Sequence, residues 1–396
     1  MMRKFITVLM VGVLLAVVFP ALAQDSGTQT QTGQQGQGIP IVTGLDVYQR
    51  AGAAFDAKDY EKAITDYSLF ILLNPTVGEG YFQRAQSYLQ LNDLDAALVD
   101  LNHTLELPPA SPDAQAQAYM LRAAIFTDRE EVDSAMADLN AALKSVPDSA
   151  DALYRRARLY LSQQQFEPAV VDLNDVVRLA PDFPDAYYFR ALANTALEAY
   201  DAAIEDYGHL IDVTPDDPTS FAGRADLYIR QEAYADALND LDAALKLDPT
   251  IGGLYLQRGM VNNRLGNAEA AAADYLEWIR GVRQGDLNQD VTLRPGESQV
   301  LNLQTGLVYA MPFEGQSGQL VSLTASARAE ATVDPLLLIM DTNGRPLTAD
   351  DDSGGHFDSA ITDFRLPADG TYIAILSHAG GGSEGIVRVL LEINSQ

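Results

Sequence analysis

Residues 44 to 281 carry a pattern of apolar and polar positions that repeats every 34 residues, apart from one longer spacing. In the unit that runs from Ala150 to Phe183, Leu153 and Ala157 share one face of a first amphipathic helix. A polar turn follows, and Ala169 and Leu173 then share one face of a second helix. A helical pair that recurs at this period predicts an α-solenoid, with seven helix-turn-helix units between residues 44 and 281.

Two positions in each unit are almost always occupied by a small residue, which allows two helices to cross at close range. The twentieth position is Ala in all seven units: Ala63, Ala97, Ala135, Ala169, Ala203, Ala237 and Ala271. The eighth is Ala51, Ala85, Ala123, Ala157, Ala191, Ala225 and Gly259. Only one spacing departs from the period, with four additional residues at about Pro112 to Gln115, and there we expect a longer loop.

This pattern resembles the tetratricopeptide repeat from about Gly44 to Gly281. The small residues, the aromatic residues near the ends of the first helix and a closing proline carry the resemblance. The proline is present in six units, as Pro75, Pro109, Pro147, Pro181, Pro215 and Pro249. The resemblance implies a right-handed α-solenoid that binds a protein or peptide segment in its concave groove.

A charged pattern accompanies the helical one, because the seventh residue of every unit is Arg and the twenty-third is Asp. In an antiparallel hairpin these positions lie at about the same level. We therefore expect a structural ladder of ion pairs, either within each hairpin or between one unit and the next. The alternative is a row of arginines that binds an anionic ligand. Among the members of the ladder are Arg156, Asp172, Arg190, Asp206, Arg224 and Asp240.

A second stripe on the first helices is distinct from their packing face. In repeats of the tetratricopeptide type this stripe lines the groove, so the resemblance implies a peptide-binding surface. Its residues include Tyr48, Phe55, Phe82, Gln86, Leu89, Met120, Tyr154, Arg158, Leu161, Tyr188 and Leu192. The alternative is that these side chains pack only against neighbouring repeats. The Lys and Asn residues that form the carboxylate clamp of co-chaperones are absent from the stripe.

Beyond residue 281 the helical pattern gives way to short alternating strands and predicts a β domain over residues 282–396. A β-sandwich or jelly roll accommodates seven or eight strands in this length, so the fold class is multidomain α plus β. The expected strands are 299–303, 308–313, 320–325, 336–340, 361–366, 372–377 and 386–393.

Short motifs in this domain resemble the bacterial pre-peptidase C-terminal domain. They are the run from Asp334 to Asp341, the turn Asn343-Gly344, the triplet from Asp350 to Asp352, and the segment from Leu366 to Tyr372. The resemblance covers about residues 296–393 and implies a small β-sandwich of secreted proteins, implicated in secretion or in binding extracellular material.

Four carboxylates of this domain, on Asp341, Asp350, Asp351 and Asp352, are clustered at a strand end in the sequence. Oxygen-rich loops bind calcium weakly, so these residues are candidate calcium ligands. The alternative is an ordinary turn, in which Asp bonds its own backbone. No other cofactor is expected.

The amino terminus has the features of a secretory signal peptide over residues 1–23. Arg3 and Lys4 precede an apolar run from Phe5 to Phe19, and Ala21 and Ala23 form a small-residue cleavage site. The stretch from Gln24 to Gly38 has hardly an apolar side chain, and we expect a disordered leader over residues 24–43. We expect no membrane span after cleavage, and a secreted, periplasmic or cell-envelope location.

The net charge of −29 argues against nucleic acid as a partner, because phosphates would be repelled. The sequence contains no cysteine, no phosphate-binding glycine loop and no nucleophile-elbow motif, so we expect a protein that is not an enzyme. The leading hypothesis is an exported interaction scaffold that binds protein in its groove, with the β domain contacting cell-wall, glycan or protein material. The alternatives are an accessory subunit of a secreted hydrolase and a self-assembling surface protein.

Overall fold

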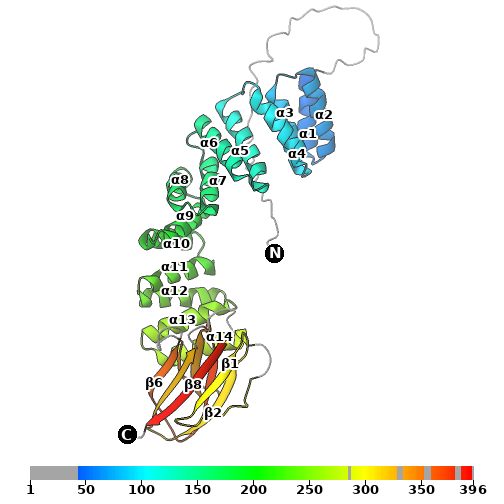
Figure 1. Cartoon of the computed structure of the whole chain (residues 1–396). Coiled ribbons are helices and arrows are strands. Elements are labelled where there is room, and N and C mark those ends of the chain that lie inside the picture. The colour runs from blue at the N-terminus through cyan, green and yellow to red at the C-terminus, as the bar shows by residue number, and fades with distance from the viewer. Residues whose placement is uncertain (1–42, 284–286, 328–332, 352–357, 380–384, 395–396) are drawn as a thin grey trace, which may run out of the picture.

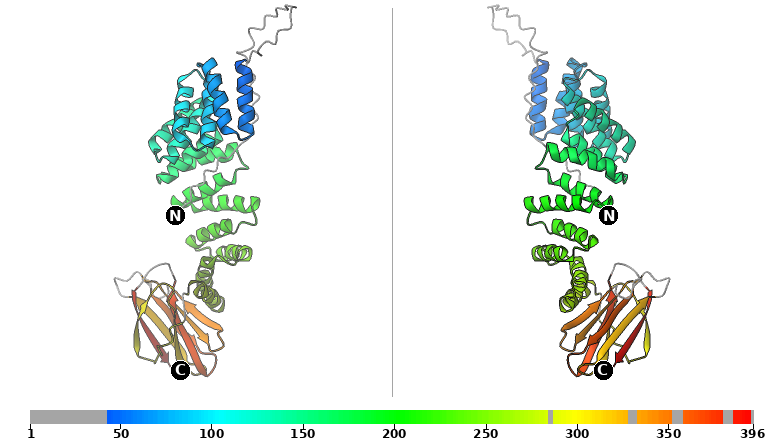
Figure 2. Two further views of the ribbon diagram at one scale, coloured as in Figure 1. Left: turned by 90° about the vertical axis from the view of Figure 1, so that its right-hand side faces the viewer. Right: turned by 90° about the vertical axis from the view of Figure 1, so that its left-hand side faces the viewer.

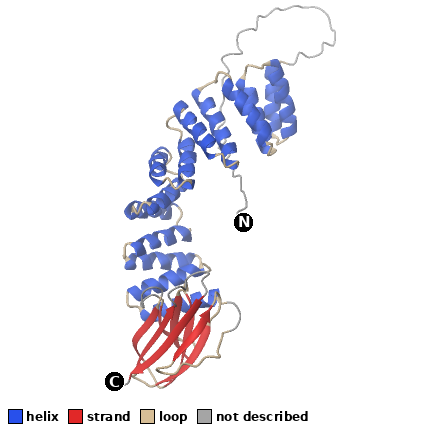
Figure 3. Cartoon of the chain, in the orientation of Figure 1, coloured by secondary structure: helices blue, strands red, loops and turns tan. Residues whose placement is uncertain are grey.

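The computed structural model describes residues 43–283, 287–327, 333–351, 358–379 and 385–394. The predicted signal peptide and the predicted leader up to residue 42 lie outside these ranges. Within them, fourteen helices form an elongated array that ends against a β domain (Figures 1 and 3). The helices are α1 Gly44–Asp56, α2 Tyr60–Leu73, α3 Gly78–Gln90, α4 Leu94–Glu106, α5 Pro112–Asp128, α6 Val132–Ser145, α7 Ala150–Ser162, α8 Phe166–Leu179, α9 Pro184–Ala196, α10 Tyr200–Val213, α11 Pro218–Arg230, α12 Tyr234–Leu247, α13 Gly252–Arg264 and α14 Ala268–Val282.

The helices pair into seven hairpins, one for each predicted unit. The turn inside every hairpin contains one residue in the left-handed region: Lys58, Asn92, Glu130, Gln164, Glu198, Glu232 and Gly266. The predicted small residues pack where the two helices cross. Ala157 and Ala169, for example, are both 0% exposed. The pattern of small residues therefore marks the crossing points that hold each hairpin closed.

The inserted residues between the second and third units do not form the longer loop expected from the sequence. They are the first turn of α5, which is 17 residues long. Ser111 is the N-cap and its Oγ accepts a hydrogen bond from the backbone N–H of Ala114, while Pro112 stands at the first helical position. Both residue types favour a helix start, so the insertion lengthens the helix.

The β domain is a sandwich of two four-stranded antiparallel sheets, ordered β1-β8-β3-β6 and β2-β7-β4-β5. Its strands are β1 Ser298–Leu303, β2 Tyr309–Gly315, β3 Leu320–Ala327, β4 Pro335–Asp341, β5 Pro346–Asp350, β6 Ser359–Arg365, β7 Gly370–His378 and β8 Gly385–Asn394. Seven of these overlap the predicted strands. The eighth, β5, is short and begins with proline, and it lies at a sheet edge, where proline is tolerated.

One sheet of the sandwich is covered on both faces. Its inner face packs on the other sheet, and its outer face packs on α14 at the end of the helical array (Figure 2). The four residues from Leu336 to Ile339 in β4 are each 0% exposed for this reason. A continuous apolar strand is the expected signature of a sheet buried on both sides.

Candidate functional site

All seven predicted arginine–aspartate pairs are present, each within its own hairpin. The Nε and Nη2 atoms of Arg156 donate to the Oδ2 and Oδ1 atoms of Asp172 at 2.8 and 2.7 Å. The same arrangement holds for Arg50–Asp66, Arg84–Asp100, Arg122–Asp138, Arg190–Asp206, Arg224–Asp240 and Arg258–Asp274. Each carboxylate is therefore engaged by the arginine of its own unit.

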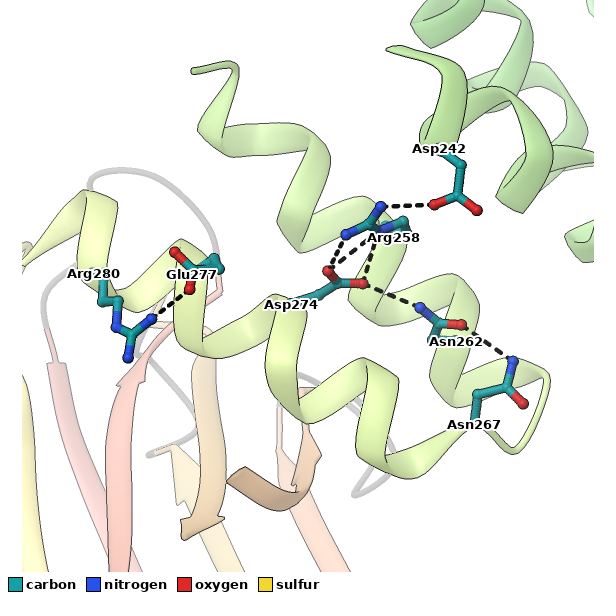
Figure 4. Close-up of polar contacts among 7 residues, drawn as sticks. All are labelled: Asp242, Arg258, Asn262, Asn267, Asp274, Glu277 and Arg280. Carbon is teal, nitrogen blue, oxygen red and sulfur yellow. Dashed lines mark hydrogen bonds and ion pairs between the residues drawn. The ribbon is translucent and has the colours of Figure 1, made fainter. Parts of the chain in front are cut away.

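A third contact of these arginines joins neighbouring repeats and was not predicted from the sequence. The Nη1 atom donates to a side chain at position 25 of the preceding unit, as in the contact of Arg258 with Asp242 at 2.7 Å (Figure 4). The other acceptors of this kind are Ser68, Asn102, Asn140 and Asn174. A short polar side chain recurs at position 25 and could have predicted this contact. Its residue type varies among Ser, Asn and Asp, which makes the pattern harder to recognise.

The last rung of the ladder extends further. Asn262 donates to the Oδ2 atom of Asp274 at 3.1 Å, and Asn267 donates to the side-chain oxygen of Asn262 at 3.2 Å (Figure 4). The guanidinium of Arg258 thus lies between two carboxylates, those of Asp274 and Asp242. The side-chain amide of Asn262, itself bonded to Asn267, holds the carboxylate of Asp274. The polar groups of this helix crossing satisfy one another.

Aromatic rings flank the ladder. The guanidinium carbon of Arg84 lies 5.9 Å from the ring centre of Tyr81 and 6.0 Å from that of Tyr88. The hydrogen bonds that Arg156 donates to Asp172 raise the pKa of Arg156. Burial raises the pKa of Asp206, although its partner Arg190 opposes the shift. The ladder arginines are committed to internal carboxylates and rings, which favours a structural role over the binding of an anionic ligand.

The structure divides the residues predicted to line the groove. Phe82 does not line it, because it is only 8% exposed and packs in the core of its repeat. Seven others are half-buried: Tyr48, Phe55, Gln86, Leu89, Met120, Tyr154 and Leu161. All of these except Gln86 pack against buried clusters, so packing between repeats accounts for much of their apolar character.

Three of the predicted groove residues are exposed, and they lie near one another in the fourth and fifth repeats. They are Arg158 on α7 and Tyr188 and Leu192 on α9. The guanidinium of Arg158 lies 5.4 Å from the ring centre of Phe189, whose ring meets that of Tyr188 edge-on at 5.4 Å. Tyr188 is 42% exposed and Leu192 is 39% exposed. They form an accessible apolar surface beside one cation.

The candidate calcium ligands do not form one cluster. Asp341 caps the turn between β4 and β5, where its Oδ1 accepts from the backbone N–H of Asn343. Asp350 lies at the far end of the same strand pair and accepts from the backbone N–H of Ala360. Asp351 follows it, and Asp352 lies outside the described residues. The described residues contain no acidic or histidine group arranged to hold a metal, and calcium binding stays a prediction.

Polar contacts fasten the β domain to the last repeat. The hydroxyl of Tyr275 donates to the Oδ1 atom of Asp351 at 2.8 Å, and the indole N–H of Trp278 donates to the carbonyl of His378 at 3.1 Å. A Cβ atom added to Gly259 would lie 2.8 Å from the Tyr275 ring. The Tyr275 ring thus occupies the space that an alanine side chain would need at the eighth position of this unit.

Comparison with known proteins tests whether the helical array belongs to the tetratricopeptide repeat family. Models described as tetratricopeptide repeat match residues 82–150, 126–195, 184–217 and 223–286. The helical array is a tetratricopeptide repeat array. No protein of the curated set matches the chain. Across the described residues, no helix of the repeats or elsewhere is long and apolar enough to cross a membrane.

Solved structures of repeat proteins are similar to parts of the chain. A tetratricopeptide repeat protein from Parabacteroides merdae is 21% identical, with 59% of this chain and 91% of that chain covered and a TM-score of 0.42. The C-terminal part of a repeat protein from Cytophaga hutchinsonii is 16% identical, with 59% and 94% covered and a TM-score of 0.49. YrrB, described as having an unusual peptide-binding site, is 20% identical, with 51% and 97% covered and a TM-score of 0.43.

Proposed function

We propose that the chain is an exported, non-catalytic scaffold that binds a protein segment in the groove of its repeats. The observation that supports this most is the exposed surface formed by Tyr188 and Leu192 beside Arg158. Large apolar side chains on the first helices of a repeat array remain in water only at a cost, and a bound segment removes them from it. The tetratricopeptide fold is a protein-interaction scaffold, which agrees with this use.

The export part of the proposal rests on the signal-peptide pattern over residues 1–23. We further propose that the β-sandwich, similar in its motifs to the pre-peptidase C-terminal domain, contacts extracellular material. The sheet β1-β8-β3-β6 is available for this, since the other sheet packs on α14.

The observations on the β domain favour protein over glycan as that material. The aromatic residues in its described part, Tyr309, Phe313, Phe364 and Tyr372, all lie in or against the core of the sandwich. Three of them are buried and Phe364 is partly buried, so none of these four rings is exposed for a sugar to stack on. The described residues therefore give no specific support to a hydrolase accessory subunit that binds polysaccharide.

Site-specific photo-crosslinking tests the groove. A photoreactive amino acid at position 188 should crosslink a discrete partner in the cells that produce the protein. The matched control is position 171, because Val171 is an exposed apolar residue, 62% accessible, on the second helix of the fourth repeat. Equal crosslinking at both positions, or products at position 171 alone, would contradict binding in the groove.

A further inference from the structure

We propose that the segment bound in the groove carries an acidic side chain beside an apolar one, with the carboxylate on Arg158 and the apolar side chain on Tyr188 and Leu192. This inference rests on the proposed function and specifies the chemistry of the partner at that site.

Arg158 forms no ion pair with any carboxylate of the described residues, unlike the ladder arginines. Its neighbour Arg155 is paired with Asp151 one turn earlier on α7. Arg158 is therefore an exposed cation without a carboxylate partner among the described residues, and its side-chain interactions are with the hydroxyl and ring of Tyr154 and the ring of Phe189. A bound cationic side chain would be repelled by it, and a purely apolar cover would desolvate it without a partner.

The guanidinium of Arg158 is held in place before any ligand arrives. It lies 5.8 Å from the ring centre of Tyr154 and 5.4 Å from that of Phe189. The Tyr154 ring is itself fixed, because it packs edge-on against Phe183 at 4.8 Å and its hydroxyl donates to Asp185 at 3.5 Å. Rings that hold the planar guanidinium reduce the entropy lost when two of its N–H groups bind one carboxylate.

The apolar half of the site continues directly from this cation. Phe189 touches both Arg158 and Tyr188, and Leu192 lies one turn beyond Tyr188 on the same helix. Only the ring of Phe189 thus separates the cation from the apolar side chains. An acidic residue followed closely by an aliphatic or aromatic residue matches both parts at once. Salt screens the negative charges of the chain that lie beyond about 8 Å. The carboxylate of Asp185, which accepts from the Tyr154 hydroxyl, offsets part of the positive charge at the site.

Selection of short random peptides displayed on phage, against the full chain, tests the inference. The expected result is enrichment of sequences with Asp or Glu next to Leu, Phe or Tyr. Selection against Arg158→Gln should retain the apolar preference and lose the acidic one. The matched control is Arg178→Gln, the same change of charge in the same repeat, at an arginine that is 60% exposed and already paired with Asp175. It should select like the native chain.

The affinity of one selected peptide, labelled with fluorescein, gives the size of the effect. Arg158→Gln should weaken its binding about ten- to a hundredfold, the range expected for hydrogen bonds to a charged group. It should leave unchanged the binding of the same peptide with its acidic residue replaced by the amide. Peptides that are apolar without an acidic preference, or that bind Arg158→Gln equally well, would overturn the inference alone. Binding unaffected by the double change Tyr188→Ala and Leu192→Ala, or no enrichment at all, would overturn the proposed groove as well.

Discussion

The carboxylates of the ladder are more deeply buried than the guanidiniums that neutralise them. The side chain of Asp172 is 5% exposed, whereas that of Arg156 is 21% exposed. A buried carboxylate is tolerated only with a well-placed partner, and the arginine supplies two parallel hydrogen bonds. Loss of the arginine would therefore leave a buried carboxylate without a charged partner in each rung.

Replacing Arg156 by methionine should lower the free energy of unfolding by about 3 kcal/mol or more, because Asp172 stays buried without its charged partner. Urea titration followed by circular dichroism measures the change. Arg178→Met is the control, since its ion pair with Asp175 is exposed, and it should cost less than about 1 kcal/mol. A loss of only a few tenths for Arg156→Met would mean that the rung adds little to stability.

The ladder arginines also join each repeat to the preceding one through the Nη1 hydrogen bond. One pair of neighbouring repeats lacks this bond. Position 25 of the fifth repeat is Gly208, so the Nη1 atom of Arg224 has no acceptor there like those of the other rungs. A Cβ atom added at Gly208 would lie 3.6 Å from that Nη1 atom, which is an ordinary contact. An asparagine at this position has room to form the missing bond.

Gly208→Asn and Gly208→Ala separate this bond from helix propensity. Alanine alone should stabilise α10 by about 1 kcal/mol, and asparagine alone by about 0.6 kcal/mol less than alanine. A hydrogen bond to Arg224 contributes about 1 kcal/mol, so the asparagine variant should equal or exceed the alanine variant in unfolding free energy. An asparagine variant that is clearly less stable than the alanine variant would show that the bond does not form.

The elements differ in how far the sequence predicts them. The hairpins follow from periodicity, because alanine at a crossing point and one turn residue per unit recur in every repeat. The first turn of α5 was misassigned although Ser111 and Pro112 are a helix-start signal, since the fixed period suggested an insertion in a loop. Exposure in the groove is not predictable from the stripe alone. Tyr154 and Tyr188 stand at the same position, and ring packing with Phe183 buries only the former.

At the scale of the whole molecule, the β domain closes the end of the repeat array. The outer face of its sheet takes the place of a further helix and covers α14. Leu336, Leu338 and Ile375, buried at this junction, would face water if residues 287–396 were separated from the repeats. The domains therefore stabilise each other. A separated β domain would expose an apolar surface that is buried in the full chain, so binding is better measured on the full chain.

The one tryptophan of the chain reports on this junction. Trp278 packs against the buried cluster between α14 and the sheet, and its indole N–H bonds the carbonyl of His378. Ala349, in β5, belongs to the same cluster and is 5% exposed. Ala349→Arg places a long charged side chain between the two parts without entering the core of the sandwich, whose buried cluster does not include it.

We expect Ala349→Arg to shift the fluorescence emission of Trp278 to longer wavelength, because the ring then meets water, while circular dichroism shows that helices and strands persist. Val300→Arg is the control, with the same new side chain at a residue of β1 that is 57% exposed on the other sheet. Its emission should match that of the native chain. If the two variants fluoresce alike, the apolar face of the sheet does not hold the domains together, and the polar contacts across the junction, among them those of Tyr275, Trp278 and Asn263, hold it instead.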